Sequence, residues 1–225
     1  MATRLALVAL VFGLGLASPA RAHVVFGTPS LHELVRDADL VVRVRIAAAR
    51  ATIRPQDARV QRPVVDAVVL EMLHGERVSR VTFVPHGHGA AEYHDGEEAL
   101  VFLRRLDRVP ELAATPLVGR VRWASLQETT DKIPLGPRTR AVWTDAARRY
   151  LAADALADPA KRHAALRETT ITLLGSRDPR LAASALRDLV SAGDVPLVTA
   201  ADVPRLEELL DRAMLPITVR VGMLA

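Results

Sequence analysis

The stretch DLVVRVRIAAA, residues 39–49, decides the fold because its apolar and basic residues alternate. A period of two residues places Val42, Val44 and Ile46 on one face of an extended chain, and Arg43 and Arg45 on the other. β-Branched residues that face a core while arginines face water are typical of a half-solvated strand. We therefore predict a β-strand here.

Four further stretches have strand character and are separated by turn signals. They cover residues 64–73, 78–84, 98–105 and 117–124. Gly75 and the glycine-rich stretch 87–89 fall between them as turns. Short strands joined by polar loops predict a small antiparallel β-barrel, because closure removes the exposed strand edges that would aggregate. A β-sandwich is the alternative.

Helical spacing is found on both sides of these strands. TPSLHELVRDA (28–38) predicts a short helix with Thr28 or Ser30 as its N-cap. PLGPRTR (134–140) indicates a linker, after which alanine, leucine and arginine recur at helical spacing. We expect helices at 139–156, 160–174, 180–191 and 202–213, and a last helical turn after Pro216. The sequence thus predicts an α+β fold, with a barrel domain at 23–137 and a helical domain at 138–225.

The first residues have the features of an export signal. Arg4 precedes the apolar run LALVALVFGLGL (5–16), and ASPARA (17–22) ends in small residues of the A-x-A type. This run is well short of the ~20 residues that span a bilayer, so we expect cleavage rather than a membrane anchor. We expect a signal peptide at 1–22, a mature chain that begins at His23, and an exported protein, periplasmic or extracellular, without a transmembrane span.

The composition excludes several kinds of partner and site. The chain has 30 Lys and Arg against 26 Asp and Glu, and loss of Arg4 and Arg21 with the signal brings these charges closer to balance. No basic run is interleaved with aromatic residues, so we expect no nucleic acid as partner. The lack of cysteine excludes disulfides, thiol nucleophiles and thiolate metal sites.

Three phrases resemble those of a widespread group of exported bacterial proteins with an OB-like or netrin-like barrel. ADLVVRVRI (38–46), VLEMLHG (69–75) and GEEALVFL (96–103) are similar to three strand phrases of that group. The resemblance covers roughly residues 30–122 and implies the barrel rather than a functional site. His74 stands where the group usually has lysine, and the cysteines that staple netrin-like domains are missing. The resemblance therefore does not imply protease inhibition.

The helical half resembles HEAT-like helical pairs. DPRLAASAL (178–186) and PITVRVGML (216–224) are similar to the D-P-x-V-R-x-x-A-L phrase that opens such helices. Terminal repeats usually carry a polar cap, whereas the last residues here are apolar. We expect a truncated array, or an end that packs on the barrel or on a partner.

Common enzyme signatures are missing from the sequence. The phosphate-binding G-x-x-x-x-G-K-[ST], the nucleophile elbow G-x-S-x-G, the zinc-protease H-E-x-x-H and the calcium loop do not occur. LHEL (31–34) begins like a zinc-protease helix but lacks the second histidine. Asp95, Glu97 and Glu98 are expected to keep a hairpin loop solvated. We predict no catalytic residues and expect that the protein is not an enzyme.

The candidate for chemistry is the histidine-rich stretch PHGHGAAEYHDGEE (85–98). His86 and His88 project from one face if the segment is extended, and His94 returns beside them if a hairpin closes there. Imidazoles bind Zn or Cu, and His23, as a mature N-terminus, offers copper both its amino nitrogen and its ring. A Cu or Zn site formed by His86, His88, His94 and His23 is one interpretation. A solvated polar loop is the other.

The aromatic residues favour burial over ligand binding. Trp123 and Trp143 flank the boundary between the halves, where we expect them to bury the interface. A carbohydrate-stacking platform is the alternative. Tyr93, in the histidine-rich stretch, is expected to be the more exposed aromatic residue.

These observations predict an exported, non-enzymatic interaction or envelope-associated module with a protein partner. The alternative is a periplasmic Cu- or Zn-binding protein that uses the histidine-rich loop. An enzyme with a dispersed site is a third hypothesis. Loss of a measurable turnover on single substitution of loop residues, without unfolding, distinguishes the third from the first.

Overall fold

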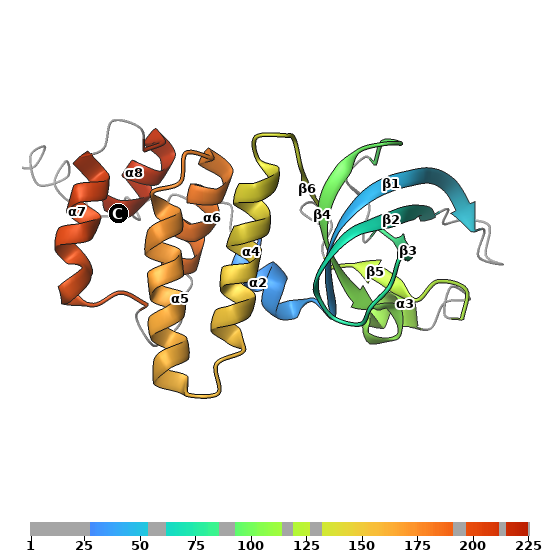
Figure 1. Cartoon of the computed structure of the whole chain (residues 1–225), viewed down its shortest axis with the longest axis horizontal. Helices are drawn as coiled ribbons and strands as arrows, with labels where there is room; N and C mark the ends of the chain where they lie inside the picture. Colours follow the sequence, from blue (N-terminus) through green and yellow to red (C-terminus); the bar gives the residue numbers. More distant parts are fainter. Residues whose placement is uncertain are drawn as a thin grey trace, which may run out of the picture.

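The computed structural model describes residues 28–53, 62–85, 93–113, 119–126, 132–190, 197–211 and 215–224. The expected signal peptide lies outside these residues, as does His23. A β-barrel comes first in the chain and most of the helices follow it (Figure 1), which confirms the predicted α+β class. In the ranges given, no helix combines the length and the apolar character needed to cross a membrane.

The barrel closes through the strand order β1–β2–β3–β5–β4 and back to β1. Its strands are β1 (Leu40–Ile53), β2 (Arg62–His74), β3 (Arg80–Val84), β4 (Glu98–Arg105) and β5 (Trp123–Ser125). Neighbours are antiparallel except β3 and β5, which run parallel. A closed five-stranded barrel with this order has the topology of an OB-type fold.

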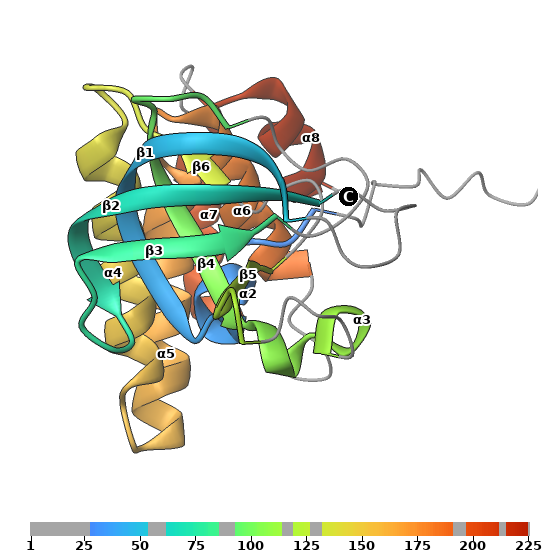
Figure 2. The ribbon, with the colours of Figure 1, turned by 90° about the vertical axis from the view of Figure 1, so that its right-hand side faces the viewer.

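The two longest strands curve around the barrel, as Figure 2 shows for β1 and β2. The register of β1 on β2 shifts at several points, one of them between Ile46 and Ala48. Such β-bulges increase the twist of a strand and bend it, so β1 can curve around the barrel. Strand β1 pairs with β2 at one edge and with β4 at the other, and the second pairing closes the barrel.

The strand predicted at 117–124 is shorter and begins later. Gly119 (φ +91°) and Arg120 form a turn, and β5 begins only at Trp123. A further strand that the sequence did not predict, β6 (Lys132–Pro134), pairs with β4 on the same edge as β5. Three-residue strands are too short to show the alternation by which strands are recognised in a sequence.

Strand β4 is buried on both faces. Ala99, Val101 and Leu103 face the interior of the barrel, where they pack with residues such as Phe83. The alternate residues of the strand, including Phe102, belong to a second core that also contains residues of the helices. This double burial explains the continuous apolar run ALVFL, since a strand covered on both sides has no solvated face.

The predicted helices form within a few residues of their expected ranges. They are α2 (Leu31–Asp37), α4 (Arg140–Asp154), α5 (Pro159–Leu174), α6 (Pro179–Val190), α7 (Val203–Asp211) and α8 (Ile217–Leu224). A short α3 (Pro110–Ala113), which the sequence did not predict, lies at one end of the barrel. Ser30 is the N-cap of α2 and forms a capping box with Glu33. Asp158 caps α5, and Asp178 accepts backbone hydrogen bonds at the start of α6. That these helices form HEAT-like repeats stays a prediction.

Helix α2 precedes the barrel in the chain but lies between α4 and the barrel (Figure 1). Leu31, Leu34 and Val35 are buried in the core that the helices share with β4. The backbone N–H of Leu31 donates to the Ser184 hydroxyl of α6, at 2.6 Å. The barrel and the helices are therefore joined by one continuous core, to which an N-terminal helix contributes.

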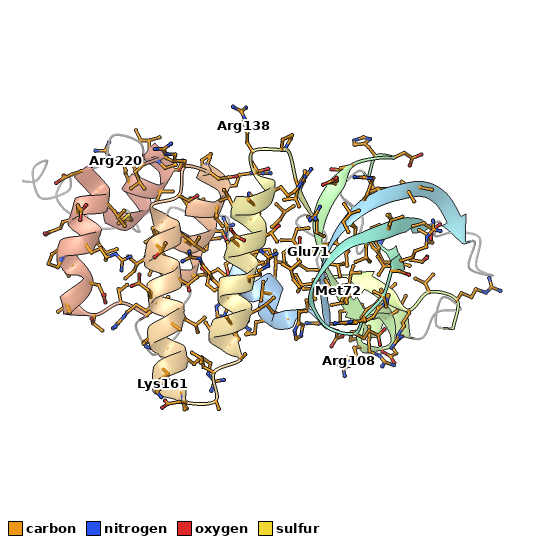
Figure 3. All side chains as sticks on the ribbon, in the orientation of Figure 1. Glu71, Met72, Arg108, Arg138, Lys161 and Arg220 are labelled. Atoms are coloured by element: carbon orange, nitrogen blue, oxygen red, sulfur yellow. The ribbon has the colours of Figure 1, made fainter. Side chains whose placement is uncertain are left out.

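A network of arginines and glutamates ties the barrel to α4. Glu98 accepts hydrogen bonds from Arg45 (2.8 Å) and Arg43 (3.3 Å) of β1 and pairs with Arg140 of α4 (2.9 Å). Glu71 of β2, on the barrel side that faces α4 in Figure 3, pairs with Arg43 and with Arg148 of α4. The acidic residue that we expected to keep a loop solvated thus connects three elements.

Glu98→Gln is expected to lower the free energy of unfolding by about 1 kcal/mol at neutral pH, since three guanidinium groups lose their shared anion. The hydrogen bond from Arg45 lowers the pKa of Glu98 from 4.5. Burial opposes this shift in part, and the charges of the arginines add to it. Its contribution is therefore complete above pH 4.5 and is lost as the pH falls through the lower pKa of the folded state. Denaturant unfolding of both proteins from pH 7 to 3 checks this. A difference that grows below pH 4.5 would contradict it.

Candidate functional site

A cleft of about 270 Å³ lies where the barrel meets the helices. We call it the junction cleft. Its apolar walls come from Leu31 and Leu34 of α2, Ile133 of β6, Trp143 of α4 and Ala183 of α6. These elements are far apart in the sequence, and the shared core brings them together. Concave, mostly apolar sites with a few polar groups are the usual form of a ligand-binding site.

Three basic side chains also line the junction cleft: Lys132, Arg180 and Arg187. The Lys132 ammonium is 2.6 Å from the Glu97 carboxylate and 4.5 Å from the centre of the Tyr93 ring. The Arg180 guanidinium lies 3.9 Å from Asp178. The charge of Lys132 is therefore closely compensated by Glu97, and the charge of Arg180 is partly compensated by Asp178.

Trp143 is held in place by the residues that begin α6. Its indole N–H donates to Asp178 Oδ2 at 2.8 Å, while Asp178 Oδ1 accepts from the backbone N–H groups of Arg180 and Leu181. The Arg180 guanidinium lies 5.5 Å from the centre of the indole ring, within the range of a cation–π contact. Trp143 is 4 % exposed, so its ring is a fixed wall of the cleft.

Arg187 differs from the other two basic residues. Its Nε is buried, and within the described part of the chain it has no hydrogen-bond partner. Burial lowers the pKa of Arg187, and the charges of Asp188 and Glu33 oppose this shift. Neither carboxylate is within ion-pair distance, and in the described ranges Arg187 forms no salt bridge. A partly desolvated guanidinium without an anion is costly, so this group is poised to bind one.

Arg187→Met is expected to raise the free energy of unfolding by about 1 kcal/mol, because methionine retains the apolar stem and removes a desolvated charge. Urea unfolding followed by circular dichroism checks this. Arg138→Met, which removes an exposed arginine outside the cleft (Figure 3), is the control and should change stability by less than about 0.5 kcal/mol. A loss of stability in Arg187→Met would show that the side chain has a partner in solution.

A buried polar cluster behind the cleft fixes α2 on the helices. The Tyr150 hydroxyl donates to Asp188 Oδ2 at 2.7 Å, and the His32 ring stacks on Tyr150 with ring centres 4.9 Å apart. His32 Nε2 also lies 3.1 Å from Asp154. Burial raises the pKa of Asp188, although hydrogen bonds with Ser30 and Tyr150 oppose the shift, and burial likewise raises the pKa of Tyr150. These groups position the wall of the cleft that α2 provides.

The predicted metal ligands are described only in part. His94 lies before an exposed turn, and its backbone N–H donates to Glu97. His86, His88 and His23 lie outside the described residues. Among the residues that are described, no group of three or more His, Cys, Asp or Glu side chains could hold a metal ion. The four-histidine Cu or Zn site stays a prediction.

If the histidine-rich loop binds metal, His86→Ala/His88→Ala is expected to lose Cu(II) or Zn(II) binding, because two of the required nitrogen ligands are removed. Calorimetric titration of the full chain, with intact mass to identify its first residue, checks this. His163→Ala, on α5 outside the loop, is the control. Equal binding by the double variant and the wild type would contradict a site at this loop.

Two expectations about aromatic residues are wrong. Tyr93 is 8 % exposed and packs edge-on against Phe83 in the barrel interior. Trp123 also lies in that interior, whereas Trp143 alone of the two tryptophans lies in the core shared with the helices. Tyr93 packs with the core residues of the barrel, and β5 places Trp123 between β3 and β4. Neither arrangement is visible in the local sequence.

The acidic residues around His94 form contacts that stabilise the fold. Asp95 Oδ1 accepts from the backbone N–H of Ala49 at 3.0 Å. Glu97 accepts from the Lys132 ammonium, and Glu98 belongs to the arginine network described above. These contacts join the turn to β1 and β6.

Comparison with models of known protein families and with curated protein sequences gives no match to this chain. The suspected relation to exported OB-like or netrin-like barrel proteins therefore rests on the three phrases quoted above.

Proposed function

We propose that this protein is an exported, non-enzymatic interaction module that holds an anionic group of its partner in the junction cleft. The observation that carries the proposal is the Arg187 guanidinium, which lines the cleft without a carboxylate partner in the described residues. A binding site gains affinity from such a group because the ligand supplies the missing anion.

The groups that could act as acids or bases near the cleft favour binding over catalysis. Asp178 holds Trp143 and the start of α6, Asp188 holds Tyr150, and Asp154 holds His32. Glu33 closes the capping box of α2. Each of these carboxylates thus accepts a hydrogen bond from a group that it holds in place, which supports a structural role.

The position of the cleft supports a module rather than two independent domains. Its walls come from β6, which pairs with the barrel strand β4, and from α2, α4 and α6. Movement of the barrel relative to the helices would therefore change the site. The Glu98 and Glu71 networks and the shared core hold the two parts together.

Site-specific photo-crosslinking in the native host tests the proposal. A benzophenone amino acid replaces Arg180, whose side chain is 55 % exposed at the cleft. The control places it at Lys161, which lies in the first turn of α5, away from the barrel (Figure 3). We expect an adduct at position 180 and none at 161, in the exported fraction. Equal labelling at both positions, or none at 180, would contradict an interaction site at the junction cleft.

A further inference from the structure

We infer that the junction cleft selects a singly charged carboxylate attached to an apolar group, with Arg187 as its anchor. This inference rests on the proposed function and names the chemistry of the group that is bound. The class includes a free apolar carboxylic acid and the C-terminus of a polypeptide with an apolar last residue. Both present the same two oxygens on an apolar body.

The charge balance of the cleft favours a single negative charge. Lys132 is compensated by Glu97 at 2.6 Å, and Arg180 lies near Asp178 at 3.9 Å. Arg187 is left without a paired carboxylate in the described part of the chain. One carboxylate neutralises this excess. A phosphate monoester, with a charge of about −1.5 to −2 at pH 7, brings more negative charge than the cleft balances.

The donor geometry of Arg187 suits two acceptor oxygens. Its guanidinium has donors arranged as a planar fork, and a carboxylate accepts from two of them in parallel. Lysine offers a point charge instead, so it does not substitute for arginine at a bidentate site. The Nε atom is itself buried, so the terminal nitrogens of the guanidinium are the donors that a ligand carboxylate would meet.

The walls of the cleft select the apolar part of the ligand. Leu31, Leu34, Ile133 and the Trp143 ring surround it, and its volume of about 270 Å³ admits a group no larger than a big side chain. Burial of the apolar surface of that group adds affinity, and a bare anion such as acetate lacks this contribution.

Helix α6 sets the width of the cleft. Arg180, Ala183 and Arg187 are spaced at three and four residues, so they form one stripe along the helix. The methyl group of Ala183 lies between the two arginines in this stripe and leaves room beside Trp143. A larger residue at 183 is expected to fill the cleft without changing its charge.

Titration calorimetry on the purified full chain at constant ionic strength tests the inference. The probes are phenylacetate, its neutral analogue phenylacetamide, phenyl phosphate and acetate. Phenylacetate is expected to bind at least tenfold more tightly than each of the others. Trp143 reports the location, since in Trp123→Phe it is the remaining tryptophan of the two and its emission should shift on binding.

Two variants and a control identify the residues. Arg187→Gln is expected to weaken phenylacetate binding at least tenfold, and Ala183→Leu to abolish it with an unchanged circular dichroism spectrum. Arg138→Gln removes the same charge from an exposed position and should leave the affinity unchanged. Unchanged affinity in Arg187→Gln, equal binding of phenylacetamide, or tighter binding of phenyl phosphate would each overturn the inference.

The carboxylate could belong to a small acid or to the C-terminus of a polypeptide. A peptide with a C-terminal phenylalanine, compared with the same peptide as its C-terminal amide, distinguishes these two sources. Tighter binding of the free-acid peptide than of phenylacetate identifies a chain terminus, and the reverse identifies a small acid. The inference and the proposed function fail separately. An adduct at position 180 together with no carboxylate binding overturns the ligand class alone, whereas carboxylate binding without an adduct overturns the interaction role and leaves the cleft's chemistry.

Discussion

Phe102→Ala is expected to lower the free energy of unfolding by about 3–5 kcal/mol, the cost of emptying the site of a fully buried phenylalanine. Phe102 is 0 % exposed and lies on β4, on the face that meets the helices. Its loss leaves a cavity in the core that joins the two parts of the protein. Because that core is continuous, we expect the barrel and the helices to be destabilised together.

Denaturant unfolding with two reporters checks this prediction. Trp123 lies in the barrel interior and Trp143 in the core shared with the helices, so Trp123→Phe and Trp143→Phe each leave one reporter. The midpoints should coincide and move together in Phe102→Ala. Phe102→Leu is the milder control and should cost less, because more of the cavity is filled. Midpoints that separate would show two independent domains, with a boundary near residue 137.

Local patterns in the sequence predicted most elements of this fold. The alternation around Arg43 and Arg45 identified β1, whose valines are buried while Arg45 is exposed. The helical spacing of alanine, leucine and arginine predicted α5 and α6, which begin at Pro159 and Pro179, close to the expected starts at 160 and 180. Such signals depend on the preferences of neighbouring residues, so they are present before any tertiary contact forms.

The arrangement of those elements could not be predicted in the same way. The hydrogen bond between Leu31 and Ser184 joins residues separated by 153 positions. The role of Glu98 also depends on arginines from two distant elements, although its sequence context indicated only a solvated turn. Long-range contacts of this kind leave no periodic trace in a single sequence.

The candidate site could not be predicted from local sequence patterns either. Arg187 is one of many arginines in the chain, and the local sequence does not show that it lacks a carboxylate partner in the described residues. The histidine-rich stretch is conspicuous because its residue types are concentrated. The junction cleft is assembled from residues that are individually ordinary, so only their juxtaposition distinguishes them.

Gly75→Ala is expected to lower the free energy of unfolding by about 3 kcal/mol, because two penalties act at one position. Gly75 has φ +96°, which is unfavourable for residues with a side chain. A Cβ built there lies 2.5 Å from the carbonyl oxygen of Asp39 and 3.0 Å from Leu40 Cδ1. The nearest obstacle is backbone, so a rotamer change cannot relieve it.

Gly119→Ala separates the two penalties. Gly119 has a similar φ of +91°, and nothing lies within 4 Å of a Cβ built there. It should therefore show only the backbone cost of about 1–2 kcal/mol. Thermal and urea unfolding of both variants measure the difference, which is the cost of the close approach. This close approach holds the end of β2 against the start of β1. Asp39 also binds Arg108 and the backbone N–H of Arg105. A larger loss of stability in Gly75→Ala than in Gly119→Ala therefore shows that this end of the barrel needs glycine for the close contact as well as for the backbone conformation. Equal losses would mean that the backbone of residue 39 can move aside.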